Sequence, residues 1–417
     1  MNYLFIHQNF PGQFQHVVRH LADRPQNRVI FITQANTNEM RGVTKLVYEA
    51  DQTPAVGVHP FLTEFDQATR NGLSVAELCR GLDAQGFRPD IIVGHIGWGE
   101  TLFLKDVWPD LPVLGYCEFY YHLVGSDVGF DPEYPAHWID GPRLRAKNAI
   151  NQLALEAIDW GQTPTGWQQA QYPAHHRPAI SVIHEGVDTD IAKPDPDAWI
   201  QLQRTGAKLT AGDEVITFVS RNLEPYRGFH IFMRALPALL KRRPKAQVLI
   251  IGADGVSYGR AAPTGTTYRE MLLAEMGDRI DFDRVHFLGQ VSHGLFINVL
   301  QLSAVHVYLT YPFVLSWSFM EAMALGCLVI GSATTPVMEV LQDGHNGLLV
   351  DFFDGPGLVD RIDEVLSHPD RMQQLRLNAR QTILDQYDLK AVALPAYLSL
   401  IDDVAAGRLR HPDRRTG

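Results

Sequence analysis

The chain has 417 residues, of which 46% are hydrophobic and 20% are charged. This composition is typical of a globular protein and excludes a disordered, collagen-like or low-complexity chain as an overall description. A single hydrophobic core rarely serves a chain of this length, so we expect two domains. The formal net charge of −11 argues against a general nucleic-acid binder, so no nucleic-acid partner is expected.

Three cysteines, Cys79, Cys117 and Cys327, are far apart in the sequence. Their number and spacing predict neither a disulfide framework nor a zinc site, which favours a reducing compartment and a cytoplasmic location. The first ten residues lack the basic lead and the long apolar stretch of a signal peptide. No run of about 18 apolar residues is present, so membrane association is expected to be peripheral at most.

Short apolar runs alternate with longer amphipathic stretches along the chain. Several runs are apolar at consecutive positions, which is typical of strands buried on both faces of a parallel sheet. We expect strands at Tyr3–Ile6, Val29–Thr33, Asp90–Gly94, Val113–Cys117, Ile180–His184, Val215–Val219, Gln247–Ile251, Val285–Leu288, Val305–Leu309 and Leu328–Gly331. The helices expected between them include Gln13–Asp23, Pro142–Glu156, Phe229–Lys241 and Arg371–Gln386. This alternation predicts an α/β fold with right-handed strand–helix–strand crossovers.

A stretch rich in Gly, Asp and Pro at residues 184–212 separates two strand series. We expect one Rossmann-like domain at 1–190, a second at 191–388, and a C-terminal helix within 389–417 that packs back on the first. Two such sheets facing across a cleft would place the active site there, because ligands bind outside the carboxyl ends of parallel strands. Asp188-Thr189-Asp190 has the Asp-x-Asp form of a metal motif, but it lies in this linker. We interpret it as a turn and expect no metal site.

One polar motif, Ser220 to Gly228, follows the predicted strand at 215–219 and contains Arg221 and Arg227. Guanidinium groups hold phosphate oxygens bidentately, so two of them on one loop can converge on a diphosphate. The alternative is a pair of solvated surface arginines.

A second motif follows the predicted strand at 305–309 and opens a helix near Ser316 or Trp317. The free N–H groups at a helix start favour an anion. Glu321, about one turn inside, has a carboxylate that can accept two hydrogen bonds from a ribose diol. Alternatively, Glu321 only stabilises the start of this helix. Further on, Thr335 and Pro336 are expected as the N-cap and first residue of another helix.

The first half of the chain offers three candidates at strand ends. Gly12, in the turn after the first strand, allows a close approach of backbone to ligand, although the turn is equally a tight connector. His95 and Glu118 follow two other predicted strands. The alternatives are a structural histidine and a buried, paired carboxylate. The neighbouring aromatic residues favour core packing over sugar stacking; they are Trp98, Phe119, Tyr120 and Tyr121.

The order and spacing of four segments resemble the donor domain of the GT-B glycosyltransferases of family 4. These segments are Arg221–Gly228, Phe287–Val291, Glu321–Gly326 and Asp343–Val350. The resemblance is strong over about 180–386 and weaker towards the first strand and Gly12. It implies retaining, metal-independent transfer of a sugar from a nucleotide-diphosphate sugar, which acts as co-substrate, with no other cofactor. The acceptor would be a carbohydrate, a lipid-linked sugar or another hydroxyl compound.

The resemblance also implies roles for individual residues. Arg221 and Arg227 would neutralise the leaving diphosphate, and Glu321 would bind the ribose. The backbone at Leu315, Ser316 and Trp317 would add phosphate contacts. Gly289 and Gln290 would lie beside the base, and Gly12 would approach the diphosphate from the other domain.

Two departures from the family pattern affect the sugar and the acceptor. Phe313 stands where the family has a glutamate, eight positions before Glu321, and Glu118 stands at about the position where many relatives have a histidine. The candidate catalytic residues are therefore Glu118 and His95 together with the two arginines. Two alternatives stay open: a nucleotide-sugar epimerase on the same scaffold, and a non-catalytic protein that binds nucleotide sugars or glycans.

Overall fold

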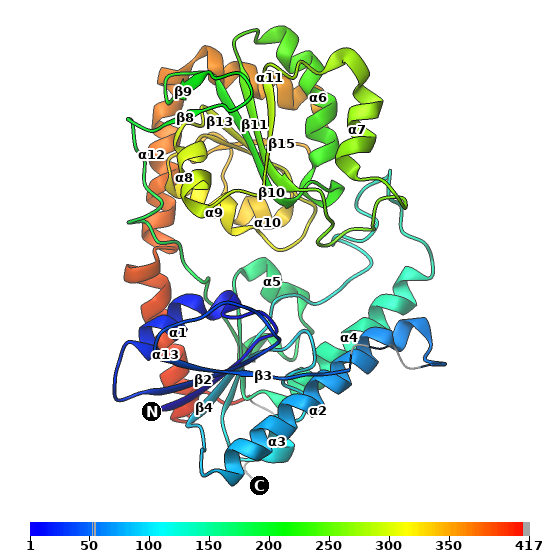
Figure 1. The fold of residues 1–417 in the computed structure, drawn as a ribbon, viewed down its shortest axis with the longest axis vertical. Helices are drawn as coiled ribbons and strands as arrows, with labels where there is room; N and C mark the ends of the chain where they lie inside the picture. Colours follow the sequence, from blue (N-terminus) through cyan, green and yellow to red (C-terminus); the bar gives the residue numbers. More distant parts are fainter. Residues whose placement is uncertain (52, 54–55, 412–417) are drawn as a thin grey trace. The chain divides into compact units, whose positions relative to one another are not determined.

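The computed structural model describes residues 1–51, 53 and 56–411 and divides the chain into two compact units (Figure 1). The first unit runs from Met1 to Gly186 and resumes at Lys390, and the second runs from Val187 to Leu389. Each unit contains one fully parallel sheet interleaved with helices. The expected α/β class with two Rossmann-like domains is confirmed.

The first unit has a sheet of order β3-β2-β1-β4-β5-β6-β7. Its strands are β1 (Asn2–Ile6), β2 (Arg28–Thr33), β3 (Val43–Val47), β4 (Ile91–His95), β5 (Val113–Tyr116), β6 (Trp160–Thr163) and β7 (Ile180–Val182). Its helices are α1 (Gln15–Ala22), α2 (Thr63–Ala84), α3 (Leu104–Val107), α4 (Asp140–Ala157), α5 (Gly166–Gln171) and α13 (Leu394–Ala405).

Alternate residues of β1 enter two different cores. Leu4 and Ile6 pack in a cluster with residues of α2 and α4, whereas Tyr3 and Phe5 pack with residues of α1 and α13. Successive side chains of a strand point to opposite faces, so helices cover both faces of this sheet. The C-terminal helix α13 lies beside α1 (Figure 1), and its residue Ile401 is buried in the cluster that contains Phe5.

The second unit has a sheet of order β12-β11-β10-β13-β14-β15. Its strands are β10 (Val215–Asn222), β11 (Gln247–Ala253), β12 (Val285–Gly289), β13 (Val305–Tyr308), β14 (Val329–Ser332) and β15 (Leu348–Val350), with a small hairpin of β8 (Trp199–Gln201) and β9 (Lys208–Thr210). Its helices are α6 (Phe229–Arg242), α7 (Tyr268–Met276), α8 (His293–Gln301), α9 (Trp317–Ala324), α10 (Thr335–Val340), α11 (Gly355–Ser367) and α12 (Pro369–Gln386).

All ten expected strands are present, although some boundaries differ. Residues 199–210, expected as part of a linker, form the hairpin β8–β9 instead. Strands β3, β6 and β15 were not expected from the sequence, because their segments are half-exposed, polar or only three residues long. The N-cap of α10 is Thr334 rather than Thr335, because Thr334 has the extended backbone of a cap and Thr335 is already helical.

Candidate functional site

In each unit the strand order reverses beside the first long strand. β1 lies between β2 and β4, and β10 lies between β11 and β13. Connections that leave such a point go to opposite faces of the sheet, which opens a crevice at the carboxyl ends of the two strands. His7 and His95 stand at this point in the first unit, and Arg227 and Thr310 follow the corresponding strands in the second.

Arg227 is a buried arginine at the reversal point of the second unit. It is 6% exposed and ends a short 3-10 helix, Pro225–Arg227. Its Nη1 donates to the hydroxyl of Tyr308 over 3.2 Å and to that of Thr310 over 2.7 Å. Within the described part of the chain, no acceptor lies at its Nε and Nη2, and no carboxylate pairs with it. An arginine is always charged, so this buried cation lacks a counter-charge.

The start of helix α9 is tied to the same arginine. The backbone N–H of Ser316, the N-cap residue, donates to the Tyr308 hydroxyl over 2.9 Å. The Ser316 side chain does not cap the helix but pairs with the hydroxyl of Ser318 at 2.9 Å. The guanidinium and an uncapped helix start therefore both donate to one phenol oxygen. Both features favour a negatively charged ligand.

The other expected donor residues lie at the ends of β10 and β12 and at the start of α9. Arg221 lies inside β10 rather than in a loop, and its side chain is exposed. Gly289 ends β12, and the adjacent Gln290 is exposed. Leu315 is buried, whereas Trp317 is 44% exposed. The roles of these five residues as donor ligands stay predictions.

Glu224 is a buried carboxylate between the two arginines of the 220–228 motif, and the sequence did not predict its contacts. Its carboxylate is 1% exposed and accepts the backbone N–H groups of Ser257, Tyr258 and Gly259 over 2.9, 3.3 and 3.0 Å. Three such bonds hold the loop after β11 against the arginine motif. As a result, the guanidinium carbon of Arg227 lies 5.4 Å from the centre of the Tyr258 ring.

Phe313 packs among aromatic rings at the position where the family has a glutamate. Its ring centre lies 4.9 Å from that of Tyr258 and 5.5 Å from that of Tyr226, and the residue is 7% exposed. An apolar cluster replaces a carboxylate here, so no acidic side chain from this position reaches towards Arg227.

Glu321, the expected ribose ligand, is paired with a histidine that the sequence analysis did not single out. Nε2 of His293, at the start of α8, lies 2.7 Å from Oε1 of Glu321. Burial raises the pKa of Glu321, while the hydrogen bond and charge of His293 act in the opposite direction. The histidine thus orients one carboxylate oxygen, and the other is available for a further donor.

In the first unit, His7 and His95 are held in one tautomer. The backbone N–H of Asn9 donates to Nδ1 of His7 over 2.8 Å, and that of Gly97 donates to Nδ1 of His95 over 3.0 Å. Because a nitrogen that accepts a hydrogen bond cannot carry a proton, both rings bear theirs on Nε2 and are neutral. Burial is the main cause that lowers the pKa of His7, to about 3.

Glu118 receives hydrogen bonds on both carboxylate oxygens. Nε2 of His95 lies 3.3 Å from Oε2, and the amide of Gln13 donates to Oε1 over 3.1 Å. The oxygen of the same amide lies 2.6 Å from Nε2 of His7. The structure thus brings Glu118 and His95 together, as a fixed carboxylate whose side chain is 30% exposed. The Trp98 ring stacks on His95 with centres 3.6 Å apart, and Phe119 is buried.

Position 12 requires a glycine for a local structural reason, whether or not a ligand is bound. Its φ angle is +55°, and an added Cβ would lie 2.6 Å from Cε1 of His7. Glycine is therefore required for the His7 ring to occupy its place.

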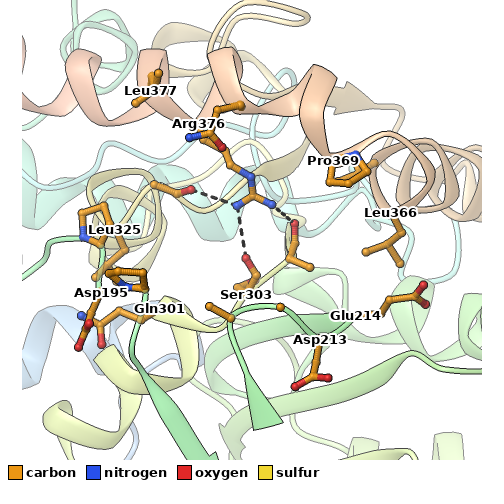
Figure 2. A pocket seen from close by; sticks show the side chains of 18 of the residues that line it. Asp195, Asp213, Glu214, Gln301, Ser303, Leu325, Leu366, Pro369, Arg376 and Leu377 are labelled. Carbon is orange, nitrogen blue, oxygen red and sulfur yellow. Dashed lines mark hydrogen bonds between the residues drawn. The ribbon is translucent and has the colours of Figure 1, made fainter.

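A cavity of about 720 Å³ lies at the amino ends of the strands of the second sheet, away from the carboxyl ends that Arg227 follows (Figure 2). It is lined by residues that precede strands, such as Asp213, Glu214 and Ser303, and by Arg376 from α12. The guanidinium of Arg376 donates to the backbone carbonyls of Ser303, Ala304 and Gly326. These bonds satisfy carbonyls at the end of α9 and before β13, so we interpret Arg376 as a structural residue.

Two family models match the chain on either side of the unit boundary. Residues 25–192 match the glycosyl transferase family 4 group, and residues 203–382 match glycosyl transferases group 1. With the two parallel-sheet units described above, these matches place the chain in family 4 of the glycosyltransferases, with the GT-B fold. The resemblance seen in the sequence is confirmed.

Individual relatives are distant. The chain is 23% identical over 282 residues to a D-inositol 3-phosphate glycosyltransferase of Corynebacterium aurimucosum, covering 67% of this chain and 62% of the relative. It is 24% identical over 260 residues to a GDP-mannose-dependent alpha-(1-6)-phosphatidylinositol monomannoside mannosyltransferase of Mycolicibacterium smegmatis, covering 58% and 62%. The matched region is thus about six tenths of the length of these curated relatives.

Solved structures share the fold. Anabaena HepE in complex with UDP and glucose superimposes with a TM-score of 0.70 at 16% identity, over 96% of this chain and 99% of HepE. Sucrose-phosphate synthase from Thermosynechococcus elongatus gives a TM-score of 0.70 at 20% identity, over 97% and 100%. Among the helices of the described residues, none combines the length and apolarity needed to cross a membrane.

Proposed function

We propose that the protein is a retaining, metal-independent glycosyltransferase that moves a sugar from a nucleoside diphosphate to an acceptor hydroxyl. The observation that carries this proposal is Arg227. Its charge is buried, and within the described residues its only side-chain hydrogen bonds go to two neutral hydroxyls. A site that holds an uncompensated cation beside a helix start is suited to a diphosphate.

Catalysis would come mainly from stabilising the charge that develops on the leaving diphosphate. Arg227 and the start of α9 are positioned before the reaction, so little reorganisation is needed as the glycosidic bond breaks. Arg221 would add a second charge. The sugar carbon would have oxocarbenium character, and a diphosphate oxygen would help to take the acceptor proton on the same face.

On the acceptor side, Glu118 is the candidate for contact with the reacting hydroxyl. Its two oxygens are held by Gln13 and His95, both neutral donors, so the carboxylate keeps its negative charge for an acceptor or for the oxocarbenium-like sugar. We also infer that the protein acts in the cytoplasm, since Cys79, Cys117 and Cys327 are all free thiols.

Calorimetric titration with UDP, GDP, ADP and their sugars tests the donor. The names of the relatives and of the HepE structure make UDP and GDP the first choices, and they make inositol phosphates and phosphatidylinositol the first acceptors to try. Transfer is then followed by NMR of the product's anomeric configuration, with and without a chelator. Inversion, or loss of activity with the chelator, would contradict the proposal. Epimerisation of a donor without acceptor would favour an epimerase.

A further inference from the structure

The Tyr308 hydroxyl is a hydrogen-bond donor whose proton has no acceptor in the described structure. Its oxygen accepts from Nη1 of Arg227 over 3.2 Å and from the backbone N–H of Ser316 over 2.9 Å. A guanidinium and an amide N–H can only donate, so neither can take the phenol proton. Among the residues that the structure describes, no other group lies within hydrogen-bond distance of this oxygen.

The surroundings of Tyr308 fix the direction of this hydroxyl. The residue is 2% exposed, and its ring stacks on Phe319 of α9 with centres 4.5 Å apart and 13° between the planes. The ring therefore cannot swing to another partner. A buried hydroxyl that leaves its proton unused costs free energy unless something in the functional state accepts it.

We propose that Tyr308 is a further ligand of the donor diphosphate, giving its O–H to a phosphate oxygen between Arg227 and the start of α9. This inference rests on the proposed function. The same hydroxyl would have two roles. Its oxygen accepts from the arginine and from the helix start and holds them in place, and its proton is donated to the anion. A phosphate oxygen is the acceptor expected beside a guanidinium and an uncapped helix start.

The test uses the full-length protein and whichever of UDP, GDP or ADP binds most tightly. Tyr308→Phe keeps the stacked ring and removes the hydroxyl. We expect the dissociation constant for the nucleoside diphosphate to rise about tenfold or more, with little change for the corresponding nucleoside. Tyr268→Phe is the matched control. Tyr268 is also buried in the second unit, and its hydroxyl donates to the carbonyl of Arg260 over 2.8 Å.

A second variant separates donation to a ligand from a structural role. Replacing Tyr308 by 3-fluorotyrosine makes the neutral phenol a stronger donor and a weaker acceptor. At a pH where it stays protonated, donation to the diphosphate predicts tighter binding, whereas a role limited to holding Arg227 and Ser316 predicts weaker binding. This measurement also decides the case if Tyr308→Phe does not fold.

The outcomes of this experiment are distinct. If the native protein binds none of the three nucleoside diphosphates, the proposed function fails. If it binds one and Tyr308→Phe binds it equally well, or if the fluorinated protein binds it more weakly, only the role of Tyr308 is overturned. Weaker binding by Tyr308→Phe together with tighter binding by the fluorinated protein supports the role.

Discussion

The imidazole of His7 occupies the space that a side chain at position 12 would need. A Cβ on Gly12 would lie between 2.6 and 2.9 Å from three atoms of the ring. His7 is in turn bonded to Asn9 and Gln13, so it cannot retreat without breaking these hydrogen bonds. The turn after β1 and the polar cluster around Glu118 are thus one packed assembly.

Gly12→Ala should destabilise the first unit by about 3 kcal/mol, because it combines a left-handed backbone angle with a steric overlap. Gly86→Ala is the control. Gly86 has a φ angle of +77°, but an added Cβ would meet no atom within 4 Å, so a cost of about 1 kcal/mol is expected. Scanning calorimetry of both variants measures the difference. Equal costs would show that the His7 ring moves aside freely.

Removing either guanidinium should slow sugar transfer. Arg221→Ala and Arg227→Ala are each expected to cost about 3 kcal/mol or more of transition-state stabilisation, measured as kcat/KM with a nucleotide sugar. Arg204→Ala serves as a control, since Arg204 is an exposed arginine of the same unit that pairs with Asp283. Near-normal turnover in both site variants would remove the diphosphate assignment.

The His293–Glu321 pair should set the acid limit of nucleotide binding. As the predicted ribose ligand, Glu321 would accept hydroxyl hydrogen bonds as a carboxylate, so we expect the affinity to be lost as the pH falls through its pKa, which burial raises. His293→Ala removes the interaction that lowers this pKa. The loss of affinity should therefore begin at a higher pH in the variant, which calorimetric titrations across the acidic range would reveal. An unchanged pH profile would argue against coupling between the two residues.

Glu118→Gln should reduce turnover while leaving the donor affinity intact. The amide keeps the size of the carboxylate but loses its charge, so a decrease of about 100-fold in kcat is expected if Glu118 contacts the reacting groups. Glu77→Gln, at an exposed position of α2, is the matched control. Should Glu118→Gln weaken nucleotide binding and spare kcat, the assignment of Glu118 to the acceptor would be wrong.

The sequence predicts individual residues of the site but not the contacts between them, because these contacts are long-range. Arg227 and Glu321 were found from motifs that are continuous in the sequence. Their partners were not, because Tyr308 lies 81 residues from Arg227 and His293 lies 28 residues from Glu321. The bond from Gln13 to Glu118 spans 105 residues. The contact from Ser257 to Glu224 likewise joins residues 33 positions apart, so the motif alone does not predict it.

Patterns within the sequence are enough to predict the α/β class, ten of the strands and the family. These depend on local burial patterns and on motifs within single segments, such as Val215–Val219 followed by Arg221 and Arg227. The strand order, and therefore which strand ends lie side by side, follows from the folded sheets. The hydrophobic pattern of a strand indicates that the strand is buried but not which strand it pairs with. The contacts among Arg227, Tyr308 and Ser316 therefore could not be predicted from the sequence.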